Sequence, residues 1–145
     1  MHDLFLPYQV SFDPDSSTYC CTGTDRDGEV FGAGSGVTPE VARRRLRETV
    51  LESLATDASD GNDFTPGFVR TPKGESCLTF TTLDLLPIRI RLARSARRLE
   101  QAEVAARMGI SQQAYAKLER PGGNPTLGLL DRLEKALQKE ILQLT

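Results

Sequence analysis

Two neighbouring glutamines, Gln112 and Gln113, are the side chains in this sequence best suited to reading a nucleic acid. They follow Ser111, whose hydroxyl is a preferred helix N-cap, so both are expected in the first turn of a helix. A carboxamide donates and accepts hydrogen bonds at once, which suits N6 and N7 of adenine. Because the first side chains of a recognition helix reach base edges in the major groove, the pattern predicts contacts with DNA bases.

The residues before Ser111 predict the element that positions these glutamines. The helix that precedes the turn is expected to begin at Glu100 or Gln101. Its buried side is formed by Val104, Ala105 and Met108. Gly109 follows where this helix must end, since glycine adopts the left-handed conformation at no steric cost. Helix, short glycine-containing turn and second helix together predict a helix-turn-helix.

The stretch LEQAEVAARMGISQQAYAKLER resembles the lambda-repressor/Cro type of helix-turn-helix domain, and the resemblance extends over roughly residues 88–140. It implies that Gln101 touches a phosphate and the glutamine of the recognition helix, and that Gln112 and Gln113 read bases. The segment RPGGNPTLGLLDRLEKAL resembles the loop and fourth helix of that family. The DNA-binding residues expected on this basis are Gln101, Ser111, Gln112, Gln113, Tyr115, Lys117, Arg120 and Asn124.

The formal net charge of −2 hides a split between the two halves of the chain. Residues 1–84 carry 7 Lys and Arg against 14 Asp and Glu, whereas residues 85–145 carry 11 against 6. Only the second half therefore has the electrostatics for a phosphate backbone. This charge weighs against the alternative of a helical module that binds protein alone. The acidic first half would repel DNA, so we expect it to perform a different task.

The sequence contains few side chains of the kinds that perform catalysis or bind metal ions. The single histidine is His2, and the three cysteines, Cys20, Cys21 and Cys77, lack CxxC spacing, so reduced thiols are expected. Asp25–Gly28 is a turn rather than a calcium loop, because alignment on Gly28 puts glycines at the first and last ligand positions. We expect no catalytic, cofactor-binding or metal site, and thus no enzyme.

The first 83 residues predict a small domain with the element order β-β-β-α-β. Three β-rich runs, at 4–12, 18–24 and 25–33, are separated by turn residues. Thr38 and Pro39 start a helix to about Ala55, with an apolar residue at every fourth position from Ala42 to Leu54. Residues 56–76 read as a loop in which 64–69 dock on the sheet, and a fourth strand begins at Cys77.

The expected fold class is therefore α+β, with a sheet domain at 1–83, a linker at 84–87 and an all-helical domain at 88–145. No apolar run approaches the ~18 residues of a membrane span. The first residues lack the basic and apolar regions of a signal peptide, so a cytoplasmic location without membrane contact is expected.

Two segments of the first domain resemble the HicB family of antitoxins. LPYQVSFDPDSSTYCCTGTD is similar to its first hairpin, and GSGVTPEVARRRLRETVLESL to its glycine-then-helix segment. The resemblance implies a degraded ribonuclease-H-like domain that blocks a small basic RNA-cleaving toxin, HicA. With the helix-turn-helix, it implies an antitoxin of a type II toxin–antitoxin system that represses its own operon as a homodimer or higher homo-oligomer. Asp25–Gly28 stands where the family frequently has Pro-Gly, which leaves the contact mode open.

Other interpretations remain open from the sequence. The chain could be a one-component regulator whose first domain senses a small molecule, or an active magnesium-dependent ribonuclease-H-like enzyme. The run Arg43–Arg47 could form a solvated helix face paired with Glu40 and Glu48, or contact an acidic partner or dimer mate. The apolar tail could form a dimer contact or cover the core of its own domain. That tail consists of Ile141, Leu142 and Leu144.

Overall fold

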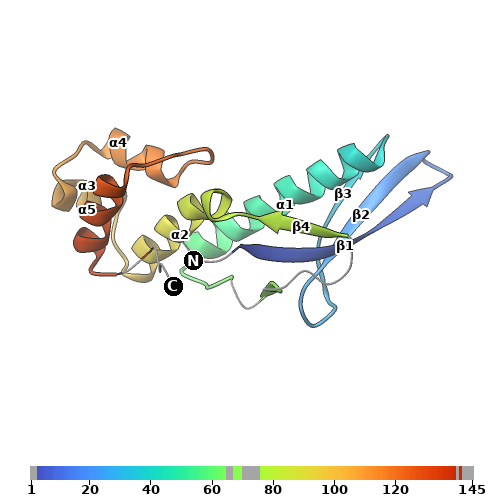
Figure 1. Ribbon diagram of the computed structural model, residues 1–145, viewed down its shortest axis with the longest axis horizontal. Helices are drawn as coiled ribbons and strands as arrows, with labels where there is room; N and C mark the ends of the chain where they lie inside the picture. The colour runs from blue at the N-terminus through green and yellow to red at the C-terminus, as the bar shows by residue number, and fades with distance from the viewer. Residues whose placement is uncertain (1–2, 65–66, 70–75, 140, 142–145) are drawn as a thin grey trace. The chain divides into compact units, whose positions relative to one another are not determined.

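The computed structural model describes residues 3–64, 67–69, 76–139 and 141 (Figure 1). Its elements, in chain order, are β1 (Leu4–Asp13), β2 (Thr18–Thr24), β3 (Val30–Gly36), α1 (Pro39–Ser59), β4 (Cys77–Phe80), α2 (Thr82–Ala96), α3 (Gln101–Met108), α4 (Gln112–Ala116), the 3-10 turn η2 (Lys117–Glu119) and α5 (Leu127–Leu137). The chain divides into two compact units. Asp3–Leu54 with Phe64–Phe80 form the N-terminal unit, and Ala55–Asp63 with Thr81–Thr145 belong to the C-terminal unit.

The N-terminal unit is a four-stranded sheet in the order β3-β2-β1-β4, in which every neighbouring pair is antiparallel (Figure 1). The predicted order of three strands, a helix and a fourth strand is confirmed, and with the helical second unit the chain has an α+β fold. Strand β1 pairs with one neighbour along its first residues and with the other along its last residues. Its residues from Tyr8 to Asp13 pair with β2, and those from Leu4 to Pro7 pair with β4.

Of the segment predicted to dock on this sheet, residues 64–69, the described residues 64 and 67–69 do so. Val69 and Phe5 exchange backbone hydrogen bonds of 3.0 and 3.1 Å, which satisfy the β1 edge where β2 has ended. Phe64 and Phe68 are buried, and the Phe68 ring meets that of Phe80 edge-on at 5.6 Å. These aromatic contacts fix a connection that composition alone marks only as a loop.

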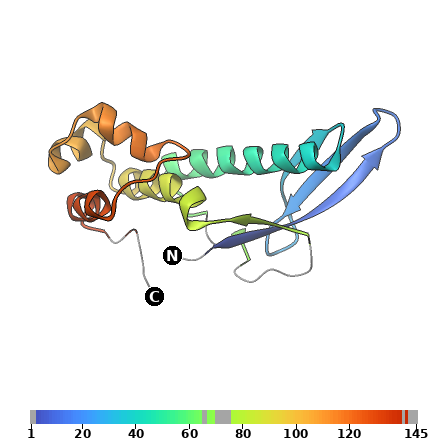
Figure 2. The same cartoon turned by 45° about the horizontal axis from the view of Figure 1, so that its top comes forward.

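Helix α1 lies along the sheet (Figure 2) and buries the predicted apolar stripe. Ala42, Leu46, Val50 and Leu54 are all 0 % exposed. The helix can approach β3 closely because Gly34 has no side chain: a Cβ there would lie 2.5 Å from the carbonyl oxygen of Ala42. The helix continues beyond the predicted end at Ala55 to Ser59, since Ala58 is also fully buried.

Residues 84–87, predicted to link two domains, lie instead inside α2. The helix begins at Thr82 because Thr81 and Asp84 form a capping box, in which each side chain bonds the backbone N–H of the other. Buried residues of the first turns anchor it: Leu85, Leu86 and Pro87. The proline marks an early position of the helix rather than its start.

The core of the C-terminal unit gathers apolar side chains from α2, α3, α4, η2 and α5. Ile141 is 8 % exposed and belongs to this core, so it covers its own unit, as one of the two interpretations of the tail required. Leu142 and Leu144 lie outside the described residues. None of the described helices combines the length and apolar character needed to cross a bilayer.

Candidate nucleic-acid interface

The predicted turn between two helices is present, with the predicted residues at its corners. Gly109 ends α3 in the left-handed conformation, at φ 69° and ψ 32°. The next N–H group, on Ile110, returns to the carbonyl of Ala105 at 3.0 Å. Ser111 then caps α4, accepting a hydrogen bond from the N–H of Ala114 at 3.1 Å. Each corner thus satisfies backbone groups that a helix end leaves unpaired.

The recognition segment, defined as α4 with η2, has one exposed and one buried side. Gln112 and Gln113 are exposed in the first turn of α4. Lys117 is also exposed and follows Gln113 by four residues, which places these two on one helical face. Arg120 is exposed at the extended C-cap of η2. Ser111 and Asn124 are exposed as well. Two amides and two cations are therefore exposed on the recognition segment and its C-cap.

Tyr115 corrects the predicted set of DNA contacts. Its side chain is 0 % exposed, and its hydroxyl donates to Oε1 of Glu119 at 2.8 Å. Tyr115 is the second residue after Gln113, so the two side chains point to nearly opposite sides of the helix. Tyr115 is a core residue that supports the recognition segment and is not available to DNA.

Gln101 is half-buried at the first position of α3. Its carboxamide nitrogen donates to Oε2 of Glu119 at 3.0 Å. Gln101 thus contacts the last residue of η2, whereas the resemblance implied a contact with the glutamine of the recognition helix. The predicted contact of Gln101 with a DNA phosphate stays a prediction.

Glu119 is the residue that sequence reasoning missed. It is only 3 % exposed, and it accepts hydrogen bonds from Arg94, Gln101 and Tyr115. Burial alone would raise the pKa of this carboxyl, but the hydrogen bonds led by that from Arg94 outweigh it and hold the pKa below its ordinary value. The available signal was the spacing of Tyr115, Leu118 and Glu119, which puts a carboxylate among core positions.

We call Glu119 and the four side chains that contact it the Glu119 cluster: Arg94, Gln101, Tyr115 and Arg91. Arg91 makes two of these contacts. Its Nε lies 3.6 Å from Oε2 of Glu119, and its Nη2 donates to the carbonyl of Glu119 at 3.4 Å. Arg91 and Arg94 are one turn apart on α2, so the carboxylate ties α2 and the start of α3 to the end of the recognition segment. This attachment orients the exposed face of α4.

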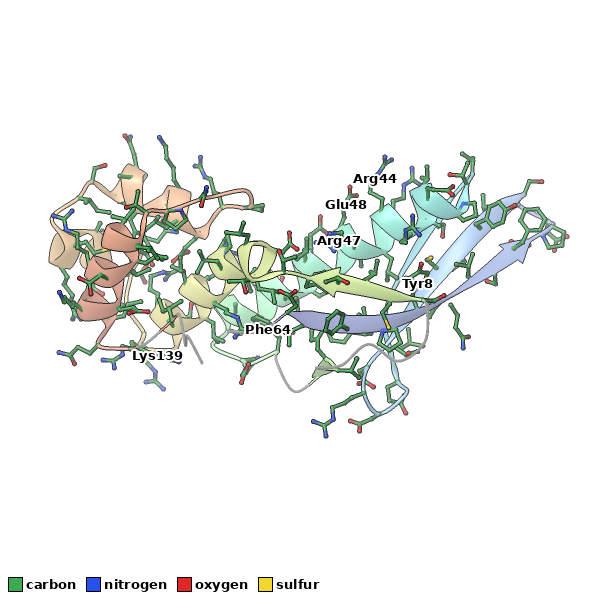
Figure 3. The ribbon with its side chains drawn as sticks, viewed as in Figure 1. Tyr8, Arg44, Arg47, Glu48, Phe64 and Lys139 are labelled. Atoms are coloured by element: carbon green, nitrogen blue, oxygen red, sulfur yellow. The ribbon has the colours of Figure 1, made fainter. Side chains whose placement is uncertain are left out.

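The arginine run of α1 turns mostly toward its own sheet. Arg43 donates to the hydroxyl of Tyr8 at 3.4 Å, and Arg45 donates to the carbonyl of Ser35 at 2.7 Å. Arg47 donates to the carbonyl of Thr79 at 2.6 Å and lies over the Phe80 ring at 4.7 Å. Figure 3 shows Arg44 on the outer side of the helix. These contacts hold α1 on the sheet, while Arg43, Arg44 and Arg45 stay exposed, as a solvated helix face requires. Glu40 is close enough to Arg43 to contribute to raising its pKa, after the larger effect of the hydrogen bond with Tyr8.

The cysteines and the side chains that could hold a metal ion are the remaining candidates for chemistry. The three cysteines are free thiols, and burial raises the pKa of Cys21. Among the residues that the structure describes, no group of three or more His, Cys, Asp or Glu side chains is placed to hold a metal ion.

Comparison with known proteins identifies the second unit. Residues 90–144 match a family model described as helix-turn-helix. No curated protein matches the chain. The matched family is a domain of DNA-binding regulators, and its matched range contains α3, the Gly109 turn and the recognition segment. The comparison thus assigns residues 90–144 a match to a helix-turn-helix, a domain that suggests DNA-binding transcriptional regulation.

Proposed function

We propose that this protein is a DNA-binding antitoxin that represses its own operon. The observation that carries the DNA-binding part is the exposure of Gln112 and Gln113 in the first turn of α4, while Tyr115 and Leu118, which follow them in the recognition segment, are buried. Two copies would place their recognition segments in successive major grooves, about 34 Å apart. A dimer or higher homo-oligomer is therefore part of the proposal.

Each polar or charged side chain of the interface has a proposed role. Gln112 and Gln113 read base edges, because a carboxamide can bond adenine in a bidentate manner. Lys117 and Arg120 neutralise DNA phosphates. Ser111, Gln101 and Asn124 make polar contacts with the sugar-phosphate backbone of the DNA. The phosphate contacts fix orientation and the glutamines supply sequence preference.

The N-terminal unit is proposed to neutralise the toxin as a HicB-like domain. The charge split supports this role, since the excess of acidic residues lies in residues 1–84. Asp27 and Glu29 are exposed at the β2–β3 turn, and Asp13 and Asp15 at the β1–β2 turn. Carboxylates of this kind attract a basic RNA-binding surface and speed its association. The element order is compatible with a degraded ribonuclease-H-like domain, which remains part of the proposal.

A gel shift with the promoter region of the protein's own operon tests the DNA-binding part. The double variant Gln112→Ala plus Gln113→Ala should lose affinity for its operator and relax its sequence preference. Gln9→Ala, which removes an exposed glutamine from β1, is the matched control and should bind like the wild type. Equal binding and equal preference of the double variant would show that the base-reading assignment is wrong.

Affinity purification of the tagged full chain from its native cell tests the antitoxin part. A small basic protein recovered in near-equal amount, with RNA-cleaving activity once separated, would support it. Asp27→Lys plus Glu29→Lys should lower this recovery while leaving the operator shift intact. Recovery of no partner, together with a ligand-dependent heat shift, would overturn the antitoxin proposal in favour of a regulator that senses a small molecule.

A further inference from the structure

The C-terminal unit carries a second basic surface that the proposed operator contacts do not use. A shallow cavity of about 660 Å³ lies among the ends of α2, α3 and α5. We call it the basic groove, and its cationic lining residues are Arg97, Arg107, Arg132 and Lys135. Met108 and Ala136 also line it. Small-molecule sites occupy about 300–1,000 Å³, so the size suits a ligand of a few tens of atoms.

Two of these cations are held in place by the protein. Arg97 donates from Nη2 to the carbonyl of Gln138 at 2.9 Å, and Arg107 donates from Nη1 to the carbonyl of Ala136 at 3.3 Å. These carbonyls belong to the end of α5, where a helix leaves acceptors unpaired. A guanidinium has five N–H donors, so each arginine keeps donors beyond the one that caps the helix. The groove is therefore preorganised for an acceptor-rich ligand.

The charge of the groove remains positive after its internal partners are counted. Lys135 is paired with Asp131 at 2.8 Å, which offsets one of the four cations. The ends of α3 and α5 each contribute about half a negative charge. The remainder is about two positive charges, which matches a phosphate dianion or two phosphodiesters. Among the lining residues there is no aromatic ring on which a base could stack.

The basic groove and the recognition segment use different residues of the C-terminal unit. None of the residues that line the groove belongs to α4 or η2. The groove residues lie at the ends of α2, α3 and α5, whereas Gln112 and Gln113 open α4. A ligand in the groove would thus leave the glutamines accessible.

We propose that the basic groove is a binding site for a phosphate-bearing ligand, separate from the operator face and able to be filled at the same time. The shared chemistry is the phosphate group, and its source is either a free phosphorylated small molecule or the backbone of a second nucleic-acid segment. This inference does not require the chain to be an antitoxin or to recognise a particular operator.

The first test titrates the full chain with sodium pyrophosphate and follows backbone amide shifts by NMR. Saturable shifts are expected at residues 97, 107, 132, 135 and 136. Arg132→Gln plus Lys135→Gln should weaken binding about tenfold or more, since two charge-assisted contacts are lost. These two residues are chosen because they are exposed, so the variant keeps its fold. Lys117→Gln plus Arg120→Gln removes the same charge from the operator face and should bind pyrophosphate like the wild type.

The second test uses a short duplex of mixed sequence and the Lys117→Gln plus Arg120→Gln variant, in which the operator face is weakened. If duplex binding persists and is lost when Arg132→Gln and Lys135→Gln are added, the ligand is a nucleic-acid backbone. If only pyrophosphate binds, the ligand is a free phosphate compound. The proposal is overturned if neither probe binds, or if both double variants lose pyrophosphate binding equally, because that loss would reflect general charge.

Discussion

Arg94 holds Glu119 through two parallel hydrogen bonds, from Nε to Oε1 at 2.6 Å and from Nη2 to Oε2 at 3.0 Å. This fork-to-fork geometry joins α2 to the end of the recognition segment, and it combines charge with a fixed orientation. A third donor of Arg94, on Nη1, bonds the carbonyl of Leu99 at 2.8 Å. One guanidinium thereby sets both the loop before α3 and the segment that presents Gln112 and Gln113.

Glu119→Gln should strongly destabilise the C-terminal unit. The substitution keeps the size of the side chain but leaves the mostly buried Arg94 without its counter-charge, and breaking a buried pair in this way costs about 3–5 kcal/mol. The exposed pair of Lys135 and Asp131 provides the control, because Asp131→Asn should cost less than about 1 kcal/mol. Urea unfolding followed by NMR signals of α3 to α5 measures both. A cost for Glu119→Gln no larger than that for Asp131→Asn would contradict the structural role of the cluster.

Acid should weaken the same unit through Glu119. The pKa of this carboxyl in the folded chain lies below the ordinary value of 4.5, because the hydrogen bonds from Arg94, Gln101 and Tyr115 outweigh the opposing effect of burial. Its stabilisation is therefore complete above that ordinary value and is lost as the pH falls through the folded value. Hydrogen exchange of α3 to α5 amides at a series of pH values should show this slope. Glu119→Gln should have a shallower slope, and parallel profiles for the two proteins would refute the assignment.

Lys117→Ala should weaken operator binding without changing its sequence preference. Lys117 is exposed on the face that carries Gln113, and a phosphate contact contributes affinity to every sequence alike. The slope of log affinity against log salt should become shallower by about 1, since one fewer counterion is released. Gel shifts over a salt series measure this slope. A change in preference at one base pair would instead indicate that Lys117 reads a base.

Gly34→Ala should disrupt the packing of α1 on β3. The added Cβ would lie 2.5 Å from the carbonyl oxygen of Ala42 and would also press on the backbone N of Leu46. Neither atom can move without shifting the helix, so a cost of about 1–3 kcal/mol or more is expected. Gly32→Ala is the matched control, because a Cβ there would make an ordinary contact of 3.5 Å with Val50. Thermal unfolding followed by sheet amide signals distinguishes the two variants, and equal midpoints would argue against the close approach.

Local signals predicted the elements of both units well. The apolar spacing from Ala42 to Leu54 and the sequence Gly109-Ile110-Ser111 each act through neighbouring backbone, so a short window contains the cause. The start of α2 was misplaced because Pro87 suggested a boundary, whereas the capping box of Thr81 and Asp84 begins the helix earlier. Pro87 lies in the second turn of α2, beyond the first four positions whose N–H groups a helix leaves unpaired, so α2 continues through it with one backbone hydrogen bond fewer.

The candidate site also combines features that the sequence determines with features that only the tertiary structure decides. The exposure of Gln112 and Gln113, the proposed base contacts, follows from their place in the first turn of a helix, which the sequence by itself determines once Ser111 is placed as the cap. The burial of Tyr115, the attachment of Gln101 to Glu119 and the gathering of four cations in the basic groove were decided only by the tertiary structure. The physical reason is separation along the chain: Arg94 and Glu119 are 25 residues apart, and only packing of the intervening helices brings their charges together.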